Sequence, residues 1–334
     1  MKRRTMGLTV AASAGFLAVC LFACGSDATK KADASAPSSQ PVQAAAPVVG
    51  ASDALPADKT GGFDGARAYD QVAKIVAFGP RPPDSEGIHK VQDYLHTQLK
   101  SFGCATEDDD FHASTPIGSV AMKNILVKIP GTSPDVILLL THYDSLKKDG
   151  FVGAEDSASS TGVMLELARM LCPKKQRLGV WIAFLDGEEA FINWDENNDN
   201  TYGSRELAAR LALADELKHV KAVILADMIG QKNVRFEREA NSTTWLAGFV
   251  WSTAGKLGYQ DVFVSSETTA ISDDHVPFKD RRLAIVDIID LNDYIQAGYW
   301  HTSEDTMDKI SARSLGIVGH VLLASVDELQ AHPR

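Results

Sequence analysis

The fold is decided by the stretch LGVWIAFLDGEE, residues 178–189. Its first part is a nearly continuous apolar run, and acidic side chains follow directly. A strand with one face in water alternates apolar and polar residues, whereas an unbroken apolar run is typical of a strand buried on both faces. We therefore predict a central strand over residues 178–185 whose carboxyl end carries Asp186, Glu188 and Glu189.

Other β-rich runs lie on both sides of this one in the chain, and helical patterns separate most of them. The clearest helical pattern has apolar residues at spacings of three and four from Ile88 to Phe102, after Ser85 as a candidate cap. Buried strands separated by helices predict an α/β fold with a mixed, mostly parallel central sheet and helices on both faces. The predicted strands are 124–129, 136–141, 178–185, 220–226 and 283–289, and the further helices are 157–171, 203–213, 242–257 and 311–329.

Polar side chains follow four of the predicted strands. A single acidic residue after a strand is usually a helix cap or a turn residue. Ligands of open α/β sheets, however, bind beyond the carboxyl ends of the strands. Four polar sets at the same edge of one sheet therefore predict a functional site. The sets are His142 with Asp144, then Asp186 with Glu188 and Glu189, then Asp227, and, after a loop, Trp300 with His301.

The residue types in these sets favour zinc. Carboxylate and imidazole ligands without a nearby cysteine suit a catalytic zinc ion that keeps an open position for substrate. Magnesium and calcium require more oxygen ligands. Because Glu188 and Glu189 are adjacent, one can bind the metal while the other keeps its basicity and acts as a general base.

Six short motifs occur in one order along the chain: HYDS at 142–145, GAEDSA at 153–158, FLDGEEAF at 184–191, DMIG at 227–230, SDDHVPF at 272–278 and WHT at 300–302. Together they resemble the glutaminyl-peptide cyclotransferases (glutaminyl cyclases), which are relatives of the zinc aminopeptidases. The resemblance runs from about Phe78 to the C-terminus. It implies a zinc aminopeptidase-like α/β/α sandwich and the cyclisation of N-terminal glutamine to pyroglutamate with release of ammonia.

The resemblance also implies a role for each matched residue. It predicts one zinc ion per chain and peptide or protein substrates with an N-terminal glutamine. The implied zinc ligands are Asp156, Glu189 and His301; the catalytic acid/base is Glu188; Asp227 and Asp273 belong to a hydrogen-bond network at the site; Trp194 and Trp300 wall the substrate pocket.

Two-zinc aminopeptidases are the main alternative. In such an enzyme His142 and Asp227 would bind the second ion, Asp156 would bridge the two ions, and Glu188 would activate water. A non-enzymatic binding module on the same scaffold would lack Glu188 or a zinc ligand, and none of these is missing. Three features favour the cyclase over the peptidase: Phe191 and Trp194 after the glutamate pair, the doubled Asp273-Asp274, and Trp300 directly before His301.

The N-terminal region is predicted to lie outside the fold. Lys2, Arg3 and Arg4 precede an apolar run that ends at Cys24, which is typical of a secretory signal. A small residue before Cys24 resembles a bacterial lipoprotein signal, with a plain signal peptide or a membrane-spanning anchor as alternatives. We expect a signal peptide over 1–24, a disordered Ala/Pro/Ser-rich tether over 25–62 and a single catalytic domain over 63–334. The protein would then be exported to the cell envelope or periplasmic side and held at a membrane through a lipid on Cys24.

The net charge of the chain bears on which macromolecules it can bind. The formal net charge of −11 argues against a nucleic acid partner, and we expect a monomer.

Cys104 and Cys172 are the cysteines outside the signal, and either a disulfide or two buried thiols is compatible with them. The acidic residues 108–110 are expected in a solvated loop. Asp287 stands where the animal cyclases carry a histidine, which leaves the substrate preference open.

Overall fold

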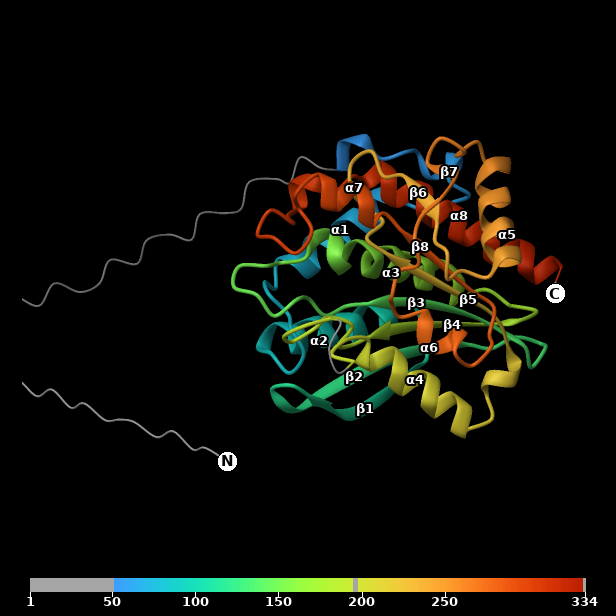
Figure 1. The fold of residues 1–334 in the computed structure, drawn as a ribbon. Helices are drawn as coiled ribbons and strands as arrows, with labels where there is room; N and C mark the ends of the chain where they lie inside the picture. The colour runs from blue at the N-terminus through green and yellow to red at the C-terminus, as the bar shows by residue number, and fades with distance from the viewer. Residues whose placement is uncertain (1–50, 195–197, 333–334) are drawn as a thin grey trace, which may run out of the picture. The chain divides into compact units, whose positions relative to one another are not determined.

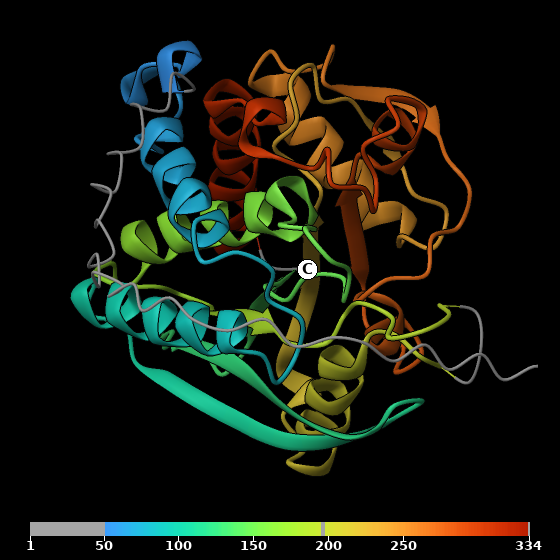
Figure 2. The same cartoon turned by 90° about the vertical axis from the view of Figure 1, so that its left-hand side faces the viewer.

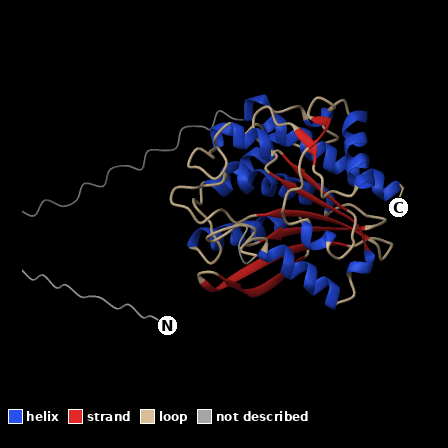
Figure 3. Ribbon diagram, viewed as in Figure 1, coloured by secondary structure: helices blue, strands red, loops and turns tan. Residues whose placement is uncertain are grey.

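The computed structural model of this protein describes residues 51–194 and 198–332. Its centre is a six-stranded sheet of order β1-β2-β4-β3-β5-β8 (Figures 1 and 3). Strands β4, β3, β5 and β8 are parallel, and β2 and β1 join one edge in antiparallel register. The predicted mixed, mostly parallel sheet is confirmed. The strands are β1 (Thr106–Thr115), β2 (Gly118–Ile129), β3 (Val136–His142), β4 (Gly179–Leu185), β5 (Val220–Asp227) and β8 (Ile285–Ile289).

Helices cover both faces of this sheet, and each face has its own apolar core. One core joins α1, α2, α3, α5 and α8 to one set of strand side chains, and the other joins α4 and α6 to the alternate set. Figure 2 shows α1, α3 and α8 together on one side and α4 on the other. The helices are α1 (Gly65–Val76), α2 (Glu86–Ser101), α3 (Ser160–Leu171), α4 (Tyr202–Leu213), α5 (Thr244–Lys256), α6 (Val276–Lys279), α7 (Leu291–Gln296) and α8 (Ala312–Ala331), and β6 (Phe236–Arg238) pairs with β7 (Phe263–Glu267).

The predicted helices over 203–213, 242–257 and 311–329 agree with α4, α5 and α8 to within two residues. The prediction of a solvated loop at 108–110 is wrong, because these residues lie in β1. This edge strand is mostly exposed, so it lacks the apolar run by which the inner strands can be recognised. Lys123 of β2 makes ion pairs with Asp108 and Asp110 across the two strands.

The folded region begins earlier than the predicted boundary at residue 63. Residues 51–62, assigned to the tether, form two short 3-10 helices, Ala51–Asp53 and Ala57–Lys59. Leu55 packs against the larger core, and Asp53 accepts a hydrogen bond from the hydroxyl of Ser311, the N-cap residue of α8. A few small apolar residues are therefore enough to dock this segment on α8. The predicted signal peptide over 1–24, with Cys24, and tether residues 25–50 lie outside the described residues. Within the described part of the chain, the helices are too short or too polar to cross a membrane.

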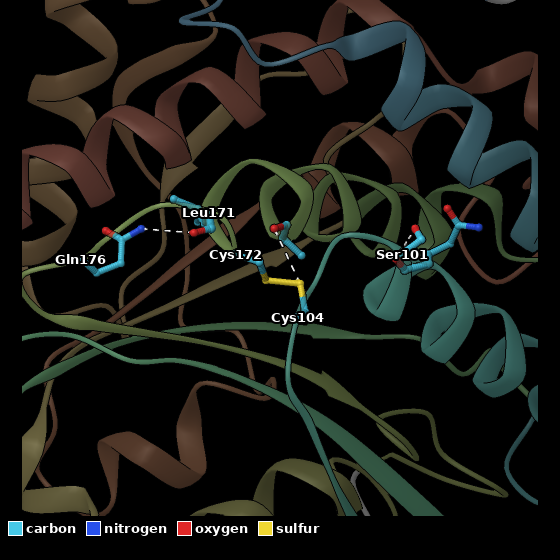
Figure 4. Close-up of a disulfide and its surroundings, with 7 residues drawn as sticks. Ser101, Cys104, Leu171, Cys172 and Gln176 are labelled. Atoms are coloured by element: carbon cyan, nitrogen blue, oxygen red, sulfur yellow. Dashed lines mark hydrogen bonds between the residues drawn. A yellow bond between two sulfur atoms is a disulfide. The ribbon is translucent and has the colours of Figure 1, made fainter.

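Cys104 and Cys172 form a disulfide, with Cα atoms 5.3 Å apart (Figure 4). Cys104 lies between α2 and β1, and Cys172 is the C-cap residue of α3. The bridge therefore links α2 and α3 on one face of the sheet, and it resolves the pairing that the sequence left open.

Candidate active site

The polar residues predicted at the strand ends meet at one edge of the sheet. The parallel register pairs His142 of β3 with Leu185 of β4, directly before the acidic segment 186–189. It likewise pairs Asp227 of β5 with Ile289 of β8. A cavity of about 440 Å³ lies here, and Glu189 is buried beside it. The predicted site residues that line this cavity are Asp156, Glu188, Trp194, Asp227, Asp273, Trp300 and His301.

Asp156, Glu189 and His301 surround one point. The Nε2 atom of His301 lies 3.3 Å from Asp156 Oδ2 and 3.3 Å from Glu189 Oε2. Apart from this contact with His301, the buried carboxylate oxygens of Glu189 have no hydrogen-bond partner among the described residues. Burying a carboxylate with too few hydrogen-bond partners costs folding free energy, and a bound cation would offset that cost. Two carboxylates and one imidazole match the donor set of a catalytic zinc site, so these residues fit zinc.

The segment that carries Asp156 has an irregular backbone. Residues Ala154–Ser159 form one helical turn between β3 and α3, but Asp156 and Ser157 have non-helical dihedral angles. Gly153 enters this turn with a φ of +50°, and a Cβ atom there would lie 2.0 Å from the carbonyl oxygen of Asp156. Glycine at 153 therefore allows the chain to turn back on itself and direct Asp156 into the cavity.

Asp305, which the sequence analysis did not single out, joins the two loops that carry Asp156 and His301. Its Oδ1 accepts hydrogen bonds from the backbone N–H of Glu155 at 2.7 Å and the hydroxyl of Tyr294 at 2.7 Å. Its Oδ2 accepts one from the backbone N–H of Asp156 at 3.1 Å. Burial raises the pKa of Asp305 to about 6. Because Asp305 follows His301 closely in the chain, one side chain holds both loops together.

His142 has a carboxylate partner at each ring nitrogen. Its Nδ1 lies 3.3 Å from Asp144 Oδ1, and its Nε2 lies 3.2 Å from Asp227 Oδ1 and 3.1 Å from Asp156 Oδ1. Although burial opposes protonation, the charges of Asp227 and Glu188 raise the pKa of His142 well above 6.5. The ligand atoms of His142, Asp156 and Asp227 also lie within 4.8 Å of one another, so this group could hold a second metal ion.

Glu188 lies in the cavity on a loop that Asp144 holds in place. The two carboxylate oxygens of Asp144 accept hydrogen bonds from the backbone N–H groups of Glu188 at 3.2 Å and Glu189 at 3.3 Å. Burial raises the pKa of Glu188 well above 4.5; the charge of Asp273 adds to the rise, and His142 opposes it. A carboxyl group with a raised pKa can act as a general acid as well as a general base.

Asp273 lies between the cavity and a buried cluster of titratable side chains. Burial raises its pKa well above the usual value, and the neighbouring charge of Asp227 adds to the rise. Behind it, His275 Nε2 lies 3.4 Å from Glu239 Oε2, and His275 Nδ1 lies 3.7 Å from Asp287 Oδ2. His275 is fully buried, so its contacts are with these carboxylates and not with the cavity.

The two tryptophans line the cavity from different loops. Trp300 stacks on His301 with ring centroids 4.1 Å apart and an interplanar angle of 23°, and 38% of its surface stays exposed. Phe151 meets the His301 ring edge-on at 6.0 Å. Trp194 follows the glutamate pair and lines the cavity with Trp300. These rings form a broad apolar wall that can hold a small substrate and exclude water.

Arg81 is another residue that sequence analysis missed. Its guanidinium is fully buried and donates to the carbonyl oxygens of Tyr143, Val152 and Gly153, at the end of β3 and before the Asp156 turn. No local pattern separates this arginine from a surface arginine, because its acceptors are backbone atoms far away in sequence. Residues 269–271 also line the cavity, and the sequence analysis did not single them out.

Comparisons with known proteins give a consistent result. The profile of peptidase family M28 matches residues 124–326. The glutaminyl-peptide cyclotransferase of Boiga irregularis is 28% identical over 287 residues, which cover 74% of this chain and 77% of that protein. The crystal structure of an Acidobacteriales bacterium glutaminyl cyclase is 36% identical with a TM-score of 0.76, and covers 80% of this chain and 95% of that one. A Zn-dependent exopeptidase from Parabacteroides distasonis is 28% identical with a TM-score of 0.72, covering 79% of this chain and 98% of that one.

Proposed function

The chain belongs to the glutaminyl cyclases of peptidase family M28, and we propose that it is a zinc-dependent glutaminyl-peptide cyclotransferase. The proposed reaction converts the N-terminal glutamine of a peptide or protein to pyroglutamate and releases ammonia. The proposal is supported by similarity over most of the catalytic domain. It is also supported by the cavity in which Glu188 and the two tryptophans meet beside the Asp156–Glu189–His301 group.

In this proposal Asp156, Glu189 and His301 hold one zinc ion. When bound, zinc supplies a Lewis acid that polarises the side-chain amide of the substrate glutamine. The two 3.3 Å spacings around His301 Nε2, and the lack of any other hydrogen-bond partner for Glu189 among the described residues, support this ligand set.

Glu188 carries the proton transfers. Its carboxylate takes a proton from the substrate α-amine as the amine nitrogen attacks the carbonyl carbon of the side-chain amide and forms the ring C–N bond. The same carboxyl group then gives this proton to the amide nitrogen, which leaves as ammonia when its C–N bond breaks. No water is consumed, and the raised pKa of Glu188 suits a group that must first accept and then donate.

The remaining cavity residues orient the substrate. Asp273, with Asp227 beside it, binds polar groups of the tetrahedral intermediate. Trp194 and Trp300 hold the glutamine side chain folded toward its own amine and exclude water. Because the attack is intramolecular, holding this folded geometry supplies much of the rate enhancement.

The choice of a single zinc ion is supported by the similarity to glutaminyl cyclases and by Trp194 and Trp300, which line the cavity beside the Asp156–Glu189–His301 group. Within that group, the Glu189 carboxylate contacts His301 Nε2 at 3.3 Å and has no other hydrogen-bond partner among the described residues.

A two-zinc aminopeptidase is the second candidate function. It is favoured by the spacing of His142, Asp156 and Asp227, whose ligand atoms lie within 4.8 Å of one another, and by the similarity to a Zn-dependent exopeptidase. In that reaction Glu188 would take a proton from water, and the N-terminal residue would be released.

One experiment separates the two functions. The purified protein is incubated with a Gln-initiated peptide and a matched Leu-initiated peptide, and the products are followed by mass spectrometry. Loss of ammonia from the first peptide, with no release of residues from either, is the expected result. Release of free leucine or glutamine would overturn the proposal. A zinc content near one ion per chain is expected, and a content near two would favour the peptidase.

We also propose that the protein is exported and held at a membrane through a lipid on Cys24. The order of charged residues, apolar run and cysteine at the N-terminus supports this. The full-length protein should label with a radioactive fatty acid and fractionate with membranes, and Cys24→Ser should lose the label. An unlabelled wild-type protein would leave a plain signal peptide as the better explanation.

A further inference from the structure

A second hollow of about 390 Å³ adjoins the active-site cavity. The two share Trp194, Trp300 and His301, so they are continuous around the tryptophan wall. A volume of this size lies in the range of small-ligand pockets, roughly 300–1,000 Å³. A substrate bound in the active-site cavity can therefore extend past Trp194 and Trp300 into this second hollow.

The two hollows differ in charge. Four carboxylates line the active-site cavity, with no lysine or arginine among the described residues that line it. Lys147 and Lys148 line the second hollow, and none of its described lining residues is acidic. The chain has a net charge of −11, but the second hollow is lined by positive charges, so it can attract an anionic group of a ligand.

The floor of the second hollow is apolar and exposed. Ile192 is 70% exposed and Trp300 is 38% exposed, and both line it beside Phe191. These are two of only five large apolar side chains that are exposed in the described part of the chain. Exposed apolar side chains that gather in a hollow beside a catalytic site indicate contact with a ligand.

Both lysines contact other residues that line the second hollow. Lys148 Nζ donates to the carbonyl oxygen of His301 at 2.8 Å, which ties the lysine loop to a predicted zinc ligand. Lys147 Nζ lies 5.8 Å from the ring centroid of Phe191, and the residue is exposed. Lys147 therefore offers its charge at the rim, next to the apolar floor.

We infer that this second hollow, which we name the lysine hollow, binds the residues that follow the N-terminal glutamine of the substrate. It favours an apolar residue on the Phe191–Ile192 floor and an acidic residue near Lys147. The inference rests on the proposed function and adds the class of peptide that the site selects. The carboxylates of the active-site cavity repel an acidic peptide, and the two lysines offset that repulsion where the peptide leaves the cavity.

The test compares three substrates: glutaminamide, which has no following residue, and two peptides of equal length, Gln-Leu-Glu-Gly and Gln-Leu-Lys-Gly. The measured quantity is kcat/KM for each peptide divided by that for glutaminamide. We expect the Glu peptide to exceed the Lys peptide about two- to fivefold at low salt, with the difference shrinking as salt rises. Lys147→Glu should reverse the order, and Ile192→Ser should lower the ratio for both peptides by up to roughly tenfold.

A matched control variant makes the same lysine-to-glutamate change at a position far from both hollows. Lys175→Glu alters an exposed lysine before the amino end of β4, at the opposite edge of the sheet, so it should leave the ratios as in the wild type. Equal effects of Lys147→Glu and Lys175→Glu would overturn the inference. The inference would also be overturned if Ile271→Ser, in the active-site cavity but outside the second hollow, changed the ratios while Ile192→Ser did not.

Measuring peptide binding to a variant that lacks the catalytic carboxylate tests the second hollow separately from the reaction. The same peptides are titrated by calorimetry into the Glu188→Gln variant, which retains the lysine hollow. A preference for the Glu peptide that Lys147→Glu reverses in this background supports the lysine hollow even if wild-type enzyme makes no pyroglutamate. Turnover of glutaminamide together with equal binding of both peptides would keep the cyclase and reject the hollow.

Discussion

Asp305 fixes Asp156 through the backbone: its Oδ2 accepts the N–H of Asp156 at 3.1 Å, across 149 residues of sequence. Asp156 is a predicted zinc ligand, and Asp305 is close in the chain to His301, another predicted ligand. The contact therefore sets the distance between two ligands that come from separate loops. Groups that orient metal ligands in this way commonly affect metal affinity nearly as much as the ligands do.

Asp305→Asn should weaken zinc binding about 10- to 100-fold. An asparagine keeps one acceptor oxygen, but its NH₂ group faces a backbone N–H that then loses its partner. We expect a further loss of about 1–3 kcal/mol in the free energy of unfolding of the metal-free protein, because the orphaned N–H is buried. Competition with a zinc chelator measures the affinity, and urea denaturation measures the stability.

Tyr294→Phe provides the graded control for Asp305, because it removes one of the three donors and leaves the Asp156 contact intact. Its effect on zinc affinity should be the smaller of the two. Equal zinc affinity in wild type and Asp305→Asn would show that the Asp156 loop holds its shape without this carboxylate.

Glu188→Gln should reduce kcat by about 10²- to 10⁴-fold while zinc stays bound, because the amide cannot take up the proton that general acid/base catalysis moves. Glu189→Gln should instead lower zinc content, since its carboxylate is a proposed zinc ligand. Metal analysis of both variants, with rates on a Gln-initiated peptide, measures the two effects separately. An active Glu188→Gln enzyme would remove Glu188 from its proposed role.

The rate of the wild-type enzyme should rise with pH through the titration of Glu188. Burial raises the pKa of this carboxyl, and only its ionised form can take the proton from the substrate amine. The rising limb of kcat/KM should therefore lie above the ordinary range of a glutamate. A limb at ordinary glutamate pH would contradict this assignment.

Asp290 offers a test of stability against pH outside the metal ligands. It is buried, accepts hydrogen bonds from Gln231 and the backbone of Arg235, and burial raises its pKa to about 6 from 3.8. Since the folded-state pKa is the higher one, the folded protein binds more protons than the unfolded chain between about pH 4 and 6. Its stability therefore falls through this group as pH rises over that range.

Asp290→Asn cannot ionise, so its stability relative to wild type should improve by about 1–3 kcal/mol between pH 4 and pH 7. Denaturant unfolding of both proteins at several pH values measures the difference. Asp261→Asn, at an exposed position, is the control, and its difference from wild type should stay nearly constant. A flat Asp290→Asn difference would show that the carboxyl ionises without cost in the folded protein.

The disulfide should contribute stability without affecting catalysis. It links Cys104 to Cys172 across 68 residues, and removing a disulfide that closes such a loop costs about 2–5 kcal/mol. Cys172 lies at the C-terminal end of α3, whereas Asp156 precedes its N-terminal end. The double variant Cys104→Ala/Cys172→Ala should therefore melt at a lower temperature but keep its kcat/KM at 25 °C. An unchanged melting temperature in reducing and oxidising buffer would contradict the prediction.

The sequence alone determined the inner sheet and the position of the site. Short continuous apolar runs are typical of strands buried on both faces, so 178–185 and its neighbours could be predicted as strands from their own residues. Parallel strands end at one edge, so the side chains after them had to meet. That reasoning led to His142, Glu188, Glu189 and Asp227. The exposed edge strand β1 escaped it, because a strand in water carries no such run.

Only the tertiary structure decided which buried polar groups form hydrogen bonds with one another. Arg81 and Asp305 bind backbone atoms that lie 62 to 150 residues away, and no spacing rule in a sequence encodes such pairs. The same holds for the bridge between Cys104 and Cys172. Local pattern reports how much of a segment is buried, but hydrogen bonds and disulfides depend on distances of a few ångströms between segments. Those distances exist only once the sheet has brought the loops of Asp156 and His301 to one edge.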